Sequence, residues 1–227
     1  MKFKILILSL SLFIFNGCRQ YYQIDNFDSL TRKHKKIAIL PFEISMTGYV
    51  APELTQEDID KIEEFESEAF QASFFHQVLE SRRNVKKRIQ VDIQHYNKTI
   101  ELLKESNISL KESWKKDPSD LAKILGVDAV MKARVEKDQY FSDGTSVGIE
   151  AGMTIIDIIA RSRGVNNPLP LSSTNKRIQS KYALINNKDG KVLWSTTSAN
   201  SGSWRSRVNE MINTINWRSS RRFPYRK

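Results

Sequence analysis

Several stretches of the chain carry apolar side chains in patterns typical of β-strands. Residues 35–42, KKIAILPF, have a continuous apolar centre, as expected for a central strand that is covered on both faces. Residues 127–141, VDAVMKARVEKDQYF, predict a longer strand. Residues 176–186 and 191–200 flank the sequence NNKDG, whose Asp-Gly pair is typical of a tight turn. The last two segments are therefore expected to form a β-hairpin.

Helical periodicity marks the longest segment between these strands. From Thr55 onward, apolar residues recur at steps of three and four, which predicts a long helix with one buried stripe. The expected stripe contains Ile59, Ile62, Phe65, Ala69, Ala72, Phe75 and Leu79. Acidic residues early in this segment and arginines at its end suit the helix dipole.

Shorter helices are predicted on both sides of the long central strand. Before it, Asp117 is a suitable N-cap, Pro118 occupies the first helical position and Gly126 ends the helix. A basic helix is expected over residues 203–217 after the hairpin. Strands thus alternate with helices early and pair as a hairpin late. This order predicts an α/β fold with a mixed central sheet flanked by helices, a late β-hairpin and a C-terminal helix.

The first seventeen residues have the pattern of an export signal. Two lysines precede an apolar run over residues 5–15, which is too short for a transmembrane span. Gly17 then precedes Cys18, the single cysteine of the chain. The sequence FNGC resembles the lipobox of bacterial lipoproteins, which implies that Cys18 is acylated and becomes the first mature residue. Acyl chains such as palmitate would then anchor the protein to a membrane.

The export signal and the lipobox resemblance imply a place in the cell envelope, and the charge of the mature chain narrows its partners there. The whole chain has a formal charge of +10, and removal of residues 1–17 leaves 34 basic and 26 acidic side chains, a charge of +8. In an exported protein this charge favours anionic lipid or acidic partners over nucleic acid. Arg19 stands where the resemblance to enterobacterial lipoproteins would place aspartate for retention at the inner membrane. We therefore expect an outer-membrane lipoprotein that faces the periplasm.

The domain organisation follows from these patterns. Residues 1–17 are the predicted signal peptide, and the polar residues 18–34 are the predicted lipidated N-terminus and tether. Residues 35–217 are predicted to form one α/β domain with an insert near residues 141–175. Residues 218–227 are expected to form a basic tail.

Four pieces of the sequence together resemble a known superfamily. They are KKIAILPF, DLAKILGVDAVMKARV, KYALINNKDGKVLWSTTSANSG and a terminal helix, in this order behind a lipobox. They resemble the curli-secretion (CsgG-like) and penicillin-binding-protein activator (LpoB-like) lipoproteins, with a fold similar to the TolB N-terminal domain, and most closely the GNA1162-type lipoproteins. The resemblance implies a fold that serves as a platform for binding other envelope proteins or copies of itself.

Residue patterns for catalysis or metal binding are weak. His34, His76 and His95 lack metal-ligand spacing, and no GxSxG or Ser/Lys signature occurs. We therefore expect no enzyme activity, no metal and no cofactor. Distant carboxylates could still form a glycosidase pair, so an envelope hydrolase stays open as an alternative.

Two segments are candidate contact surfaces. In the expected insert, Ile155, Ile158 and Ile159 share one side of a predicted helix, which makes them candidates for contact with a partner. Near the C-terminus, Arg218, Arg221, Arg222 and Arg226 interleave with aromatic residues and could contact headgroups or an acidic partner. A core-packed helix followed by a frayed basic tail is the simpler interpretation of this second segment.

The sequence predicts a lipid-anchored, non-catalytic binding or assembly module of the cell envelope. Its partner would be another envelope protein. A self-assembling subunit of a ring or secretion-type complex is the first alternative, and an envelope hydrolase is the second.

Overall fold

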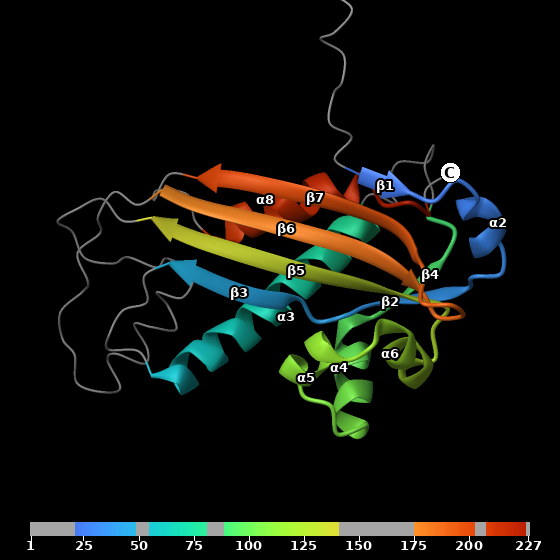
Figure 1. Cartoon of the computed structure of the whole chain (residues 1–227), viewed down its shortest axis with the longest axis horizontal. Helices are drawn as coiled ribbons and strands as arrows, with labels where there is room; N and C mark the ends of the chain where they lie inside the picture. The colour runs from blue at the N-terminus through green and yellow to red at the C-terminus, as the bar shows by residue number, and fades with distance from the viewer. Residues whose placement is uncertain (1–20, 49–54, 81–88, 141–174, 203–207, 226–227) are drawn as a thin grey trace, which may run out of the picture.

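The computed structural model describes residues 21–48, 55–80, 89–140, 175–202 and 208–225. These residues form a mixed seven-stranded sheet with helices on both faces (Figure 1), which confirms the predicted fold class. The strands are β1 (Tyr21–Gln23), β2 (Lys36–Ile39), β3 (Glu43–Gly48), β4 (Asp92–Gln94), β5 (Ala129–Tyr140), β6 (Asn175–Asn186) and β7 (Val192–Gly202). The helices are α2 (Phe27–Thr31), α3 (Gln56–Glu80), α4 (Tyr96–Glu105), α5 (Leu110–Lys115), α6 (Pro118–Leu125) and α8 (Val208–Ser220).

The sheet is built around β5, and its order is β1-β7-β6-β5-β2-β4. β5 pairs antiparallel with β6, and β6 pairs antiparallel with β7, so the predicted hairpin is confirmed. Gly190 lies in its turn with a φ of 66°, a conformation that glycine adopts without steric cost. β1 adds an antiparallel strand to the outer side of β7, whereas β2 is parallel to both β5 and β4.

The strands on either side of Pro41, β2 and β3, both pair with β5. β2 pairs with the start of β5, and β3 pairs in parallel with a later part of β5, from Arg134 to Gln139. Between them, the amide of Leu40 donates to the carbonyl oxygen of Met131 at 2.9 Å. Proline has no amide hydrogen to donate, so it interrupts the ladder without changing the direction of the chain. β2 therefore ends just before Pro41, and β3, which the sequence pattern does not predict, continues from Glu43 to Gly48 beside the same strand.

Helices α3 and α8 cover one face of the sheet. A cluster of buried aromatic side chains lies between these helices and the sheet: Phe42, Phe70, Phe74, Tyr182 and Phe223. The Tyr182 hydroxyl donates to Oδ1 of Asn216 at 2.7 Å, and Nδ2 of Asn216 donates to the carbonyl oxygen of Phe70 at 3.1 Å. Two hydrogen bonds thus join β6, α8 and α3 inside the apolar core.

The buried stripe of α3 differs from the predicted one. Phe65 is 55% exposed, although the periodicity placed it in the stripe. Ile62 and Phe75 of the predicted stripe are buried as expected, and the main buried row follows a four-residue step: Ile62, Glu66, Phe70, Phe74 and Val78. Glu66 is polar, and its burial depends on an ion pair with Lys137 of β5. An apolar pattern cannot find a stripe whose second member is a carboxylate.

In the described part of the chain, helices cover only part of the second face of the sheet. Helices α4 and α6 bury Leu103, Leu121 and Leu125 against Leu40 and Val130 of the sheet. The predicted ends of α6 are confirmed, because the Asp117 carboxylate accepts from the amides of Ser119 and Asp120, and Gly126 ends the helix with a φ of 63°. The short helix α5 begins with a capping box formed by Ser109 and Glu112, which the predicted elements did not include.

Asp128 connects the starts of the two central strands. Its Oδ2 accepts from the amides of Lys35 and Lys36 at 2.7 and 2.9 Å, and its own amide donates to the carbonyl oxygen of Lys36. These bonds fix β2 beside β5 at the point where α6 ends. The LGVD motif therefore has a structural role in this fold.

Two boundaries of the expected domain also change. The predicted tether, residues 18–34, contains β1 and α2, and Phe27 is buried against Tyr225 with ring centroids 5.3 Å apart. The predicted tail contains Phe223 and Tyr225, which are both buried in the main core. The folded domain therefore includes residues 21–34 and extends at least to Tyr225.

Candidate binding surface

The part of the second sheet face that α4 and α6 do not cover carries polar side chains. We call this surface the open face and define it by Glu43, Lys132, Arg134, Glu136, Lys181, Ala183, Ser195 and Thr197. The sheet register places these residues in adjacent rows, because Arg134 is opposite both Glu43 and Lys181, and Lys181 is opposite Thr197. Strands β3, β5, β6 and β7 therefore combine to form one surface.

The alternation of β5 explains why this surface is polar. Ala133 and Val135 point into the core under α3 and α8, while Lys132, Arg134 and Glu136 point to the other side. In β6, Tyr182 and Leu184 are buried, whereas Lys181 is exposed. The same period of two that builds the core thus builds the open face.

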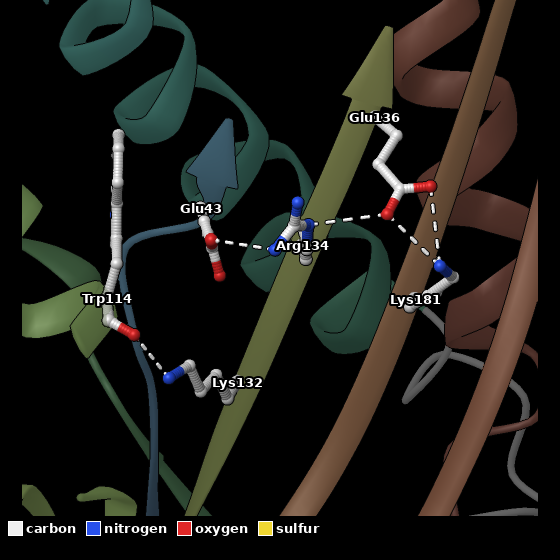
Figure 2. A network of polar contacts seen from close by, with 6 residues as sticks. All are labelled: Glu43, Trp114, Lys132, Arg134, Glu136 and Lys181. Atoms are coloured by element: carbon white, nitrogen blue, oxygen red, sulfur yellow. Dashed lines mark hydrogen bonds and ion pairs between the residues drawn. The ribbon is translucent and has the colours of Figure 1, made fainter. Parts of the chain in front are cut away.

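Figure 2 shows the charged side chains of the open face linked in a chain of ion pairs. Arg134 contacts Oε1 of Glu43 at 3.1 Å through Nη1 and Oε1 of Glu136 at 3.3 Å through Nε. Lys181 contacts the same Glu136 carboxylate at 3.1 Å. All four side chains retain solvent contact, so these pairs contribute about 0–1 kcal/mol each to stability. Their arrangement thus does little for folding and leaves them available for a partner.

Lys132 has a different contact. Its ammonium donates to the backbone carbonyl oxygen of Trp114 in α5 (Figure 2), whereas Arg134 and Lys181 contact carboxylates. The Nζ of Lys111 lies 5.8 Å from the centre of the Trp114 ring and also contacts Asp60 and Glu63 of α3. Helix α5 thus forms one border of the open face, and Lys132 provides a positive charge beside that border.

The open face contains a shallow depression of about 340 Å³. Its lining comes from β5, β6 and β7: Lys132, Ala133, Arg134, Lys181, Tyr182, Ala183, Ile185, Ser195, Thr196 and Thr197. Small-molecule sites enclose most of the surface of their ligand, and this depression is open. An open floor with small side chains in its centre and charges around it suits side chains from a macromolecular partner.

The residues predicted from the sequence lie elsewhere or outside the described ranges. Cys18, Ile155, Ile158, Ile159 and Arg226 fall outside the described residues. Arg218, Arg221 and Arg222 are exposed at the end of α8 and in the turn that follows it. Arg218 donates to the carbonyl oxygen of Ala199 in β7, and Arg221 and Arg222 follow in the next turn of chain, so these arginines lie outside the open face. The alternation in VMKARVEK indicates which side chains of β5 lie on the open face. It does not indicate how much of that face α6 covers.

His76 and His95 both pack against the rings of Phe75 and Tyr96, whereas His34 contacts Tyr225 elsewhere, so the three histidines do not share one site. His34 Nδ1 lies 2.6 Å from the Tyr225 hydroxyl, His95 caps α4 by accepting from the amide of Asn97, and His76 is exposed on α3. Within the described part of the chain, no group of three His, Cys, Asp or Glu side chains is placed to hold a metal ion. Among the same residues, no helix combines the length and the apolar character needed to cross a membrane.

The burial of His34 predicts a pH dependence of stability. Burial lowers the pKa of His34 below its ordinary value of 6.5, against the raising effects of Asp128 and Asn186. The unfolded chain then binds more protons than the folded one just below pH 6.5, so stability is fully present above that pH and falls as the pH decreases. We expect the urea midpoint to be lower at pH 5.5 than at pH 7.5.

The matched variants for this prediction are His34→Gln and His76→Gln. The first should remove part of the difference between the two pH values, and the second should leave it unchanged because His76 is exposed. Equal pH dependence in the wild type and in His34→Gln would show that His34 does not cause it.

Comparisons with known proteins provide structural likeness without a family assignment. No protein-family model matches the chain, and no curated protein matches it. Three similar solved structures illustrate the arrangement. Lipoprotein GNA1162 from Neisseria meningitidis matches with a TM-score of 0.44 and 13% identity over 83% of this chain and 96% of that one. The PelC dodecamer from Paraburkholderia phytofirmans matches with a TM-score of 0.40 and 11% identity over 82% and 84%. The LpoB C-terminal domain from Escherichia coli matches with a TM-score of 0.32 and 10% identity over 74% and 84%.

Two of these proteins are of the kinds that the sequence motifs resemble. The similarity concerns the arrangement of strands and helices, and it assigns no partner or activity to this chain. The wider grouping with curli-secretion and TolB proteins stays a prediction from the motifs.

Proposed function

We propose that this chain is a lipid-anchored, non-catalytic binding module of the bacterial cell envelope that engages a partner protein through the open face. The observation that supports this best is a sheet surface with charged side chains that none of the described helices covers, next to a layer of helices that covers the rest of the same face. The lipobox-like sequence at Cys18 supports the location in the envelope. The anchor would bring the domain to its partner, and the open face would bind it.

The charge pattern indicates the kind of partner. Arg134 and Lys181 already contact Glu43 and Glu136, whereas Lys132 contacts a backbone carbonyl oxygen. A carboxylate of the partner could therefore pair with Lys132 without competing against a carboxylate of the same chain. We infer that the partner presents an acidic side chain next to small polar groups that fit over Ala183 and Ser195. Charge complementarity of this kind provides specificity and a faster association.

The absence of catalysis is part of the proposal. Glu43 and Glu136 both contact the same Arg134 guanidinium, an arrangement that serves ion pairing and leaves the centre of the depression to the small side chains of Ala183 and Ser195. The depression is also too open to exclude water from a reacting group. These features favour the binding role over the envelope hydrolase.

Crosslinking in cells tests the proposed role of the open face. A photoreactive amino acid at Ala183, in the depression, should capture a distinct envelope protein, and the same amino acid at Ile124, which is 39% exposed on α6, should not. Lys132→Glu should reduce the capture at Ala183 at least several-fold, because it places a like charge against the acidic group of the partner. Lys188→Glu, with the same change of charge in the exposed hairpin turn, serves as the matched control.

The possible outcomes separate the functions that the sequence leaves open. Capture that depends on Lys132 and yields another envelope protein supports the binding module. Capture of a second copy of this chain would favour the ring subunit instead. Capture that is unaffected by Lys132→Glu, or that occurs equally at Ile124, would contradict the role of the open face.

A further inference from the structure

The first strand, β1, begins only three positions after Cys18, the expected lipid anchor. Only Arg19 and Gln20 separate Cys18 from Tyr21, where β1 begins. Three residue steps span at most about 10 Å even when fully extended. Because β1 pairs with β7 from Tyr21 onward, an acyl chain on Cys18 has to leave the protein close to this edge of the sheet. The anchor therefore lacks the length that would let the domain rotate freely above the membrane.

The same edge carries basic and aromatic side chains. We call it the edge patch and define it by Tyr21, Trp217, Arg218, Arg221 and Arg222. Tyr21 is 46% exposed and Trp217 is 48% exposed. Tyr21 is opposite Thr196 of β7, and Thr196 is buried on the sheet side that α8 covers, so Tyr21 and α8 share one side of the sheet. Figure 1 shows β1 and α8 at the β7 edge of the sheet.

Two contacts hold the arginines of the edge patch in place. Nη1 of Arg218 donates to the carbonyl oxygen of Ala199 at 3.3 Å, which brings its side chain across β7 a few residues beyond the pairing with β1. The guanidinium carbon of Arg221 lies 4.8 Å from the centre of the Trp217 ring, a distance typical of a cation–π contact. The positive charges thus lie beside an exposed indole, on the outer side of α8.

We propose that the edge patch lies against the anionic headgroups of the membrane that holds Cys18, so that the domain sits on the bilayer in one orientation. This inference rests on the proposed lipid anchor. Tryptophan and tyrosine prefer the headgroup level of a bilayer, and arginines near an anionic surface are attracted to it. The exposed acidic residues next to β1 in sequence, Asp25 and Asp28, follow its other end, toward α2.

This orientation leaves the open face accessible. The open face is on the side of the sheet opposite α3 and α8, and the strand β4 and helices α4 to α6 lie away from the β1 edge. A domain that stands on its β1 edge therefore presents both sheet faces sideways along the membrane. A partner anchored in the same membrane could reach Lys132 without displacing the lipid contact.

The test uses the lipidated full-length protein reconstituted into vesicles that contain phosphatidylglycerol and a headgroup-linked nitroxide lipid. Because Cys18 is the only cysteine and carries the lipid, a new cysteine accepts a fluorescent probe at one chosen position. A probe at Arg222→Cys, in the edge patch, should be quenched several-fold more strongly than a probe at Ile124→Cys on α6. Both positions are exposed, so the two variants are matched in their access to label.

A second pair of variants tests the role of charge. Changing Arg218, Arg221 and Arg222 together to Gln should reduce the quenching of a probe at Tyr21→Cys and its sensitivity to salt. Changing Lys104, Lys115 and Lys116 together to Gln, which removes the same charge from the α4–α5 region, should change neither.

The outcomes distinguish a failure of the orientation from a failure of the anchor. If the protein floats with the vesicles but the probes at 222 and 124 are quenched equally, the orientation is wrong and the anchor stands. If the protein does not float with the vesicles, the anchor proposal falls and the orientation falls with it.

Discussion

Replacing Lys137 by methionine is expected to lower the free energy of unfolding by about 3–5 kcal/mol. The Nζ of Lys137 lies 2.5 Å from Oε1 of Glu66, and the two side chains are only 6% and 2% exposed. The substitution keeps much of the volume of Lys137 but leaves the Glu66 carboxylate buried without its positive partner. Urea unfolding at pH 7, followed by circular dichroism, measures the loss.

The controls for this prediction separate burial from charge. Lys61→Met removes a lysine from the exposed pair with Glu57, in which Nζ and Oε1 are 2.6 Å apart, and should cost less than about 1 kcal/mol. The double variant Lys137→Met with Glu66→Leu removes both charges and should recover most of the loss, because no uncompensated charge remains in the core. If Lys137→Met costs as little as Lys61→Met, the pair does not contribute to the core as the structure indicates.

Local signals in the sequence were enough to predict much of the fold. Asp117, Pro118 and Gly126 defined both ends of α6, and the NNKDG turn defined the hairpin of β6 and β7. Each of these features depends on a few neighbouring residues whose backbone preferences are strong. They could therefore be predicted without knowledge of the rest of the chain.

The features that depend on distant residues could not be predicted. Glu66 is buried because Lys137, 71 residues later, provides its partner, and Tyr21 belongs to the sheet because β7 provides an unpaired edge. Phe27 and Tyr225 pack together from opposite ends of the chain, so both ends looked polar and unstructured in the sequence. In each case, tertiary contact rather than local pattern determined the outcome.

The candidate binding surface shows the same limit. The alternation in β5 predicts that Lys132, Arg134 and Glu136 share one side of a strand. Whether that side is solvated depends on how far α4 and α6 extend over the sheet, and this is set by their packing on Leu40 and Val130. The basic and aromatic pattern near the C-terminus instead favoured Arg218, Arg221 and Arg222, which lie outside the open face.

Replacing Cys18 by alanine is expected to abolish the incorporation of palmitate completely and to leave a precursor that retains residues 1–17. The thiol is the atom that the lipobox resemblance assigns to acylation, and no second cysteine is present to replace it. Metabolic labelling with palmitate, together with the mass of the intact protein, measures both effects. Gln20→Ala is the matched control, since it changes a residue in the same short segment and should leave labelling and processing unchanged.

The expected effect on membrane attachment is equally large, because a single acyl chain binds a bilayer only marginally and stable anchoring takes at least two signals. A lipidated Cys18 would supply several chains, and the edge patch of Tyr21, Trp217 and the three arginines would add a weaker, salt-dependent contact. Without the signal peptide and without the lipid, the domain should therefore leave the membrane fraction at high salt, while the lipidated protein stays there. Continued palmitate labelling of Cys18→Ala, or a mature chain of unchanged mass, would show that Cys18 is not the anchor and that the two-residue spacing to β1 does not constrain the domain.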